Sequence, residues 1–134
     1  MIFIDTGAFI ARYVGADQHH AQSLPLWKRI EQNRPVCITS NLVLSETLTY
    51  LGRHVNYNFA VQKGKILYAS HWLGILRPME EEDTAGLRYF EKFADQEVSF
   101  TDCVSFALMH NRKVRQVFSF DRHFSLAGFE LYQG

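Results

Sequence analysis

The feature that most constrains the fold is an alternation of short apolar runs with longer stretches of helical periodicity. The apolar runs lie at residues 2–4, 36–39, 72–76, 114–118 and 129–132, and each is only three to five residues long. Between them, apolar residues recur every three or four positions, as expected of amphipathic helices. Short strands that are apolar on both faces and alternate with helices are typical of a parallel sheet. The sequence therefore predicts an α/β fold.

Helices are expected near residues 7–14, after Asp17, after Ser40, and over residues 57–70, 80–94 and 101–111. Asp17 and Ser40 are expected to act as N-caps, and Ser99 or Thr101 to open the helix over 101–111. The first turn of the helix over 80–94 is acidic, which suits the helix dipole. The expected buried face of that helix consists of Leu87, Phe90, Phe93 and Ala94.

Length and charge limit the class of protein. The 134 residues suit one domain spanning residues 1–134. Fourteen basic and fourteen acidic residues cancel, so contact with a nucleic acid would need a local basic patch. The N-terminus shows no signal peptide, and no stretch approaches the roughly 20 apolar residues of a membrane span. Cys37 and Cys103 lie in no zinc-binding pattern. We expect a cytoplasmic protein with no membrane association.

Four carboxylates stand at positions where an α/β sheet gathers functional groups. Asp5 ends the first strand and Asp121 follows a late strand, while Glu46 and Asp102 lie early in helices. Functional side chains of parallel sheets collect at the carboxyl ends of strands and in the first turns of the next helices. Taken singly, each acid also suits a helix cap, a turn or an exposed surface. Taken together, the four are expected to converge.

Converging carboxylates repel one another, and a divalent cation relieves that repulsion. Oxygen ligands without a His or Cys cluster favour Mg²⁺ or Mn²⁺ over zinc. A metal held in this way binds a phosphate and activates a water molecule. The acids therefore suggest hydrolysis of a phosphodiester.

Four segments carry a family resemblance: IFIDTGAFIA at residues 2–11, TSNLVLSETLTYL at 39–51, SFTDCVSFALM at 99–109, and VFSFDRHFSLAGF at 117–129. Their order and separations resemble PIN domains, and most closely the VapC-like toxins, over nearly the whole chain. The resemblance implies a three-layer α/β/α fold with a central, mainly parallel sheet. It also implies a metal-dependent endoribonuclease that uses Mg²⁺ or Mn²⁺.

In this resemblance Asp5, Glu46, Asp102 and Asp121 form the catalytic and metal-binding quartet, and Asp5 and Asp102 are expected to be the most direct ligands. The neighbouring polar side chains resemble residues that orient the carboxylates or metal-bound waters. These are Thr6, Ser40, Asn41 and Ser119.

Binding of RNA needs cations for the phosphates. Arg12 and Arg122 lie close in sequence to Asp5 and Asp121, so we expect these two to contact RNA. Less favoured cations are Arg53, Arg112, Lys113 and Arg115. None of the six histidines is placed to pair with the acids. His123 directly follows Asp121 and Arg122 and is a candidate to assist them, but packing or solvent exposure is favoured. His19, His20 and His54 are expected to lie at the surface.

The resemblance also implies a cognate antitoxin as partner. Surplus apolar residues over 40–70 suit either an antitoxin helix or a homodimer face. Two other functions stay open: a PIN nuclease of RNA processing that is not a toxin, and a catalytically silent module that binds metal or protein. A receiver domain or a haloacid-dehalogenase-type phosphatase fits poorly, because Asp5 has no second acid beside it and Ser119-Phe120-Asp121 stands where a receiver needs Lys.

Overall fold

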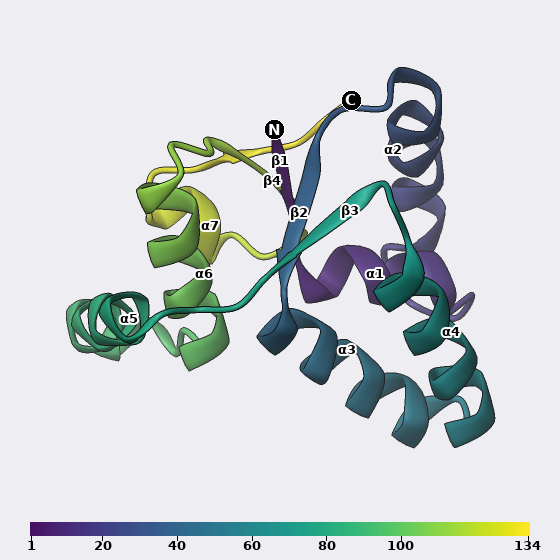
Figure 1. Cartoon of the computed structure of the whole chain (residues 1–134), viewed down its shortest axis with the longest axis horizontal. Helices are drawn as coiled ribbons and strands as arrows, with labels where there is room; N and C mark the ends of the chain where they lie inside the picture. Colours follow the sequence, from purple (N-terminus) through teal and green to yellow (C-terminus); the bar gives the residue numbers. More distant parts are fainter.

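Strand β1 lies at the centre of a five-stranded parallel sheet of order β3-β2-β1-β4-β5. The computed structural model describes residues 1–134, and every strand pair in it is parallel (Figure 1). Ile2 pairs with Cys37 on one side and with Gln116 on the other. The strands are β1 (Ile2–Ile4), β2 (Cys37–Ser40), β3 (Leu73–Leu76), β4 (Gln116–Phe118) and β5 (Glu130–Leu131).

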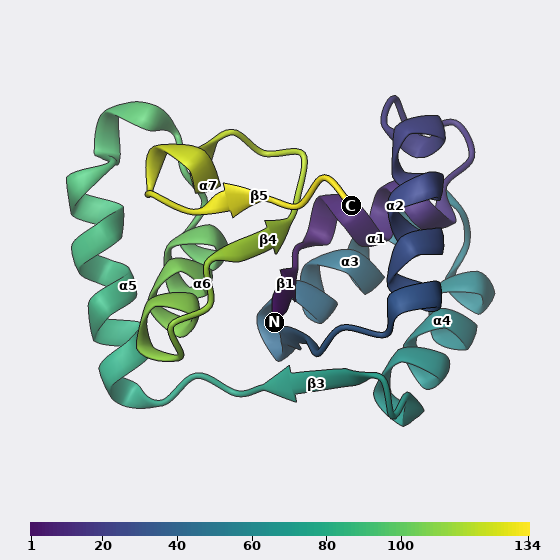
Figure 2. The ribbon, with the colours of Figure 1, turned by 90° about the horizontal axis from the view of Figure 1, so that it is seen from above.

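Helices cover both faces of this sheet, which gives the predicted three-layer arrangement. Helices α1 to α4 lie on one side and α5 to α7 on the other (Figures 1 and 2). The helices are α1 (Thr6–Tyr13), α2 (His20–Asn33), α3 (Asn41–His54), α4 (Tyr57–Ala69), α5 (Glu80–Lys92), α6 (Phe100–Asn111) and α7 (His123–Leu126), with a 3₁₀ turn at Ala94–Gln96.

The core lies between the sheet and its two helical layers. Strand β1 is buried at every residue, as expected of a central strand with helices on both faces. Large aromatic side chains fill the remaining space, and five phenylalanines are fully buried: Phe3, Phe9, Phe106, Phe118 and Phe124. Cys37 and Cys103 are free and buried. None of the helices combines the length and hydrophobicity of a membrane-spanning segment.

Two of the expected helix caps are present and one is not. The Ser40 hydroxyl accepts a hydrogen bond from the Val43 N–H, and the Ser99 hydroxyl accepts one from the Asp102 N–H. The prediction for Asp17 is wrong, because α2 begins three residues later at His20. Asp17 instead accepts a hydrogen bond from the His19 N–H and stabilises the preceding turn, a local bond that Asp readily forms.

The predicted buried face of α5 is also wrong in part. Leu87 and Phe90 are exposed, with 57% and 45% of their surface accessible. The face that is buried contains Glu82 and Gly86, because α5 approaches α6 closely there. A Cβ atom on Gly86 would lie only 2.8 Å from Val104 Cγ2, so a glycine permits this approach. The hydrophobic pattern of α5 does not mark its buried face, because a charged residue and a glycine occupy the contact positions.

Candidate metal centre

The carboxyl ends of β1, β2 and β4 lie at one edge of the sheet, and the acidic residues gather there. Asp5 follows β1, Asp121 lies three residues after β4, Glu46 lies in α3 and Asp102 in the first turn of α6. All four line a single cavity of about 620 Å³. Only Ile10 and Phe120 contribute apolar side chains to its lining. The structure thus brings together carboxylates that are up to 116 positions apart in the sequence, from 5 to 121.

Asp5 is buried at the inner end of this cavity, where Ser119 fixes one of its oxygens. The Ser119 hydroxyl donates a 2.8 Å hydrogen bond to Asp5 Oδ2 and accepts one from the Asp121 N–H at 3.0 Å. One serine therefore links the two aspartates across the sheet. Asp5 Oδ1 is buried and has no hydrogen-bond partner. An unpaired buried carboxylate oxygen is costly unless a cation or a proton satisfies it.

The side chain of Glu46 is held by a hydrogen bond from the first helix. The Thr6 hydroxyl donates a 2.8 Å hydrogen bond to Glu46 Oε1. This bond joins the start of α1 to α3 and leaves the second carboxylate oxygen of Glu46 free of a hydrogen-bond partner in the protein. Thr6 also lines the cavity.

Ser40 and Asn41 are set back from the cavity and do not line it. Ser40 is buried and caps α3, so it fixes the start of the helix that carries Glu46. Asn41 is half-buried, and its side-chain oxygen Oδ1 has no hydrogen-bond partner. Ser40 therefore acts on the site through the position of α3.

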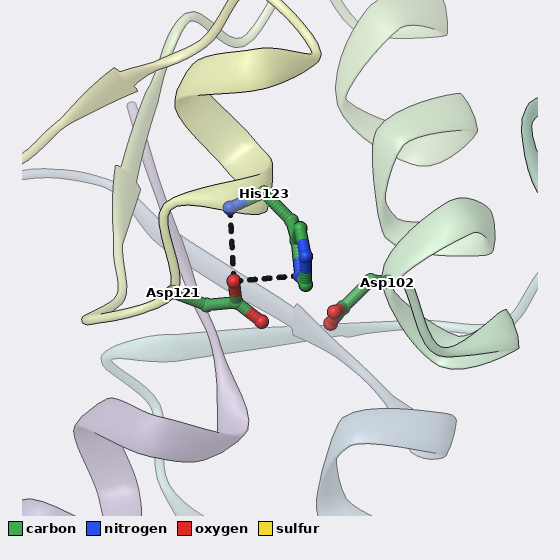
Figure 3. A group of neighbouring side chains, drawn as sticks. All are labelled: Asp102, Asp121 and His123. Atoms are coloured by element: carbon green, nitrogen blue, oxygen red, sulfur yellow. Dashed lines mark hydrogen bonds and ion pairs between the residues drawn. The ribbon is translucent and has the colours of Figure 1, made fainter. Parts of the chain in front are cut away.

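The tightest group of metal-ligating side chains contains Asp102, Asp121 and His123. One ligand atom from each lies within 4.8 Å of the other two. Figure 3 shows the two carboxylates pointing toward one another, with the imidazole beside them. Asp121 Oδ1 accepts a hydrogen bond from the His123 N–H and lies 2.8 Å from His123 Nδ1. The second oxygen of Asp121 points toward Asp102 (Figure 3).

Burial and mutual repulsion disfavour the ionised acids. Burial raises the pKa of Asp102 to about 9, with further contributions from the charges of Asp5 and Asp121. Burial likewise raises the pKa of Asp5 to about 6, although the hydrogen bond from Ser119 opposes the rise. A positive charge inside the cavity would reverse both effects. The unpaired Asp5 oxygen, the raised pKa values and the spacing of the ligand atoms all fit a bound divalent cation.

Several residues that line this cavity are not predicted from the sequence to do so. The prediction that no histidine pairs with the acids is wrong for His123. A signal was present, since an aspartate often bonds the backbone two residues on, which brings residue 123 against Asp121. His19 was expected at the surface, yet it is half-buried and its ring stacks on Phe120 at 4.4 Å between centroids. Glu97 also lines the cavity. No sequence pattern indicates His19, Phe120 or Glu97.

The two arginines expected to contact RNA lie in different places. Arg122 is exposed and lines the acidic cavity. Arg12 lines a separate cavity, where its guanidinium forms a 2.9 Å ion pair with Glu31 and lies over the Trp27 ring. The structure therefore brings Arg122, but not Arg12, next to the carboxylates.

Comparison with known proteins agrees with this architecture. The sequence profile of the PIN domain family matches residues 2–130. The protein named 23S rRNA-specific endonuclease VapC20, from two strains of Mycobacterium tuberculosis, is 34% identical over 96% of this chain and 95% of its own length. A crystal structure of M. tuberculosis VapC20, described as a sarcin-ricin loop cleaving toxin, superposes with a TM-score of 0.86. That structure is 29% identical and covers 97% of each chain. The chain belongs to the PIN domain family.

Proposed function

We propose that this protein is a metal-dependent endoribonuclease that hydrolyses RNA phosphodiester bonds. The observation that carries the proposal is the convergence of four carboxylates around a buried Asp5 oxygen that has no partner in the protein. Membership of the PIN domain family and the similarity to VapC20 support the same activity.

In this proposal Asp5, Asp102, Asp121 and Glu46 hold Mg²⁺ or Mn²⁺, whose preference for oxygen ligands matches the carboxylates. A divalent ion held by these residues would polarise the scissile phosphate and lower the pKa of a bound water. The protein supplies the geometry: Ser119 holds Asp5, Thr6 holds Glu46, and the His123 N–H holds Asp121. Fixing the carboxylates in advance lowers the cost of organising the site during the reaction.

We further propose that the protein is the toxin of a toxin–antitoxin pair and that its substrate is ribosomal RNA. The relative VapC20 is named as a 23S rRNA-specific endonuclease and described as a toxin that cleaves the sarcin-ricin loop, and it matches nearly the full length of this chain. A cognate antitoxin and a homodimer are the expected protein partners. Exposed apolar side chains on one face of α4, namely Tyr57, Val61 and Tyr68, offer a surface for such contacts.

Sequencing of RNA ends after induction tests the proposal. Induced wild-type protein is expected to create discrete new ends in 23S rRNA, and Asp5→Asn to create none, because the amide removes the charge at the buried ligand. Purified protein is expected to need Mg²⁺ or Mn²⁺ for the same cuts. Co-expression of the product of a small neighbouring gene is expected to suppress them if that gene encodes the antitoxin.

Asp83→Asn is the matched control, since it makes the same chemical change at an exposed acid in the first turn of α5. It is expected to cut as the wild type does. An Asp5→Asn protein that still cleaves RNA in a metal-dependent way would refute the assignment. Absence of cleavage by wild-type protein with either metal would favour a silent binding module.

A further inference from the structure

A second cavity, of about 500 Å³, continues from the acidic one along helix α3. The two cavities share Thr6, Ile10 and Glu46. The rest of the second cavity is lined by α3 alone, through Ser45, Thr49, Tyr50, Arg53 and His54. Glu46, Tyr50 and Arg53 are spaced four and three residues apart, so they lie on one face of the helix. A ligand that reaches the carboxylates can therefore extend over this face without leaving the groove.

Arg53 gives this groove a cation that is free to bind a ligand. Arg53 is exposed and forms no salt bridge within the chain, whereas Arg12 pairs with Glu31 and Arg112 with Glu82. The chain has no net charge, so attraction of a phosphate backbone must come from local cations of this kind. Arg53 lies seven residues beyond Glu46, about 10 Å along the helix axis. Arg53 can therefore contact a backbone phosphate other than the scissile phosphate at the carboxylates.

Beside Arg53, two flat rings form a platform. The rings of Tyr50 and His54 stack with centroids 3.9 Å apart and planes 13° from parallel. His54 Nδ1 lies 3.0 Å from the Tyr50 carbonyl oxygen, which holds the imidazole in place. Aromatic platforms next to cations are the usual means by which proteins bind unpaired nucleotides. Tyr50 and Ile10 are the only apolar contributors to this cavity, so an apolar partner helix fits it poorly.

We propose that Tyr50, Arg53 and His54 on α3 bind the single-stranded RNA that flanks the scissile phosphate. In this arrangement Arg53 contacts a backbone phosphate, and the Tyr50–His54 pair stacks an unpaired base. The proposal rests on the proposed RNA-cleaving function. It adds the position of the RNA strand on one side of the scissile phosphate.

The test measures binding of a short, labelled single-stranded RNA across a salt series, with Asp5→Asn in every protein so that RNA is not consumed. Arg53→Gln is expected to reduce the slope of log affinity against log salt by about 0.7, the value of one phosphate contact on a single strand. Arg88→Gln is the matched control, because Arg88 is exposed on α5 and lines a different cavity. It is expected to keep the parent slope.

Stacking is tested with 2-aminopurine placed at successive positions of the RNA. One position is expected to show fluorescence quenching that Tyr50→Leu abolishes and Tyr50→Phe retains, with about a tenfold loss of affinity in the leucine variant.

Equal slopes for the Arg53 and Arg88 variants, or quenching that survives Tyr50→Leu, would overturn the proposed RNA contacts on α3 while the nuclease proposal stands. A parent protein that binds no RNA would overturn both.

Discussion

Ser119 is the residue on which the geometry of the carboxylates most depends. Its hydroxyl touches Asp5 and the backbone of Asp121, which follow the two adjacent strands β1 and β4. The side chain is buried, although it also lines the cavity. A single hydroxyl group therefore sets the distance between two proposed metal ligands.

Replacement of Ser119 by alanine is expected to weaken metal binding by about 10- to 100-fold, as loss of a supporting residue typically does. Asp5 Oδ2 then loses its donor, which raises the pKa of Asp5 further above its usual range. Ser119→Thr keeps the hydroxyl and is expected to bind nearly as the wild type does. Isothermal titration with Mn²⁺ measures all three proteins, and an unchanged affinity in Ser119→Ala would contradict the supporting role.

The limits of sequence analysis are clearest at this scale. Asp5, Glu46, Asp102 and Asp121 were recognisable because strand ends and helix starts of a parallel sheet converge whatever the intervening sequence. His19 and Glu97 were not, because both reach the cavity from irregular segments before α2 and α6. Glu97 has a left-handed backbone with φ of 57°, a conformation that its sequence does not indicate.

At the scale of elements, Glu82 joins the start of α5 to the end of α6. Its carboxylate accepts hydrogen bonds from Arg112 Nη1 at 2.6 Å, from the Asn111 amide at 3.3 Å, and from the Met79 N–H at 3.1 Å. Burial alone would raise the pKa of Glu82, but the bonds from Arg112 and Met79 lower it below its usual value. One of the acids in the first turn of α5 is thus a buried connector between two helices.

Glu82→Ala is expected to cost about 2 kcal/mol of stability at neutral pH, because hydrogen bonds to a charged group are lost. That corresponds to a fall in Tm of about 7 °C for a chain of this size. A carboxylate with a lowered pKa stabilises the fold above its unfolded pKa, and this stabilisation disappears as the pH falls through its folded pKa. The difference between wild type and variant should therefore shrink below about pH 4. Glu81→Ala, at an exposed neighbour, serves as control in thermal unfolding.

The same elements show why the fold was largely predictable and its packing was not. Apolar runs as short as Ile2–Ile4 mark buried strands whatever lies around them, so the sheet and its parallel direction followed from the pattern. The buried face of a helix is harder to assign when its contact positions carry no apolar side chain. In α5, Leu87 and Phe90 form one stripe, but Gly86 allows the backbone of α5 to come close to Val104 and turns a different face inward.

For the molecule as a whole, the acidic cavity opposes folding when no metal is bound. The raised pKa values of Asp5 and Asp102 mean that the folded state holds protons which the unfolded chain releases near pH 4. The penalty is small below that pH, where both states are protonated, and grows as pH rises toward about 9. Stability of the metal-free protein should therefore decline with rising pH over this range.

Thermal unfolding in EDTA is expected to show Tm falling between about pH 5 and pH 8. Mg²⁺ is expected to raise Tm more at pH 8 than at pH 6, because at pH 8 fewer protons must leave the carboxylates when the metal binds. Asp102→Asn is expected to raise the metal-free Tm at pH 8 by about 5 °C, equivalent to 1–2 kcal/mol, and to remove most of the effect of Mg²⁺. Asp83→Asn should behave as the wild type does. A flat pH profile in EDTA would contradict the burial argument.

The position of β1 between β2 and β4 has a consequence for synthesis on the ribosome. Asp5 is synthesised long before its partner Ser119 and the nearby Asp121, which lie 114 and 116 positions later. A nascent chain thus carries an incomplete set of carboxylates until residue 121 has been added. Products of premature termination before residue 119 have the same deficiency, so they are expected to bind no metal at this site.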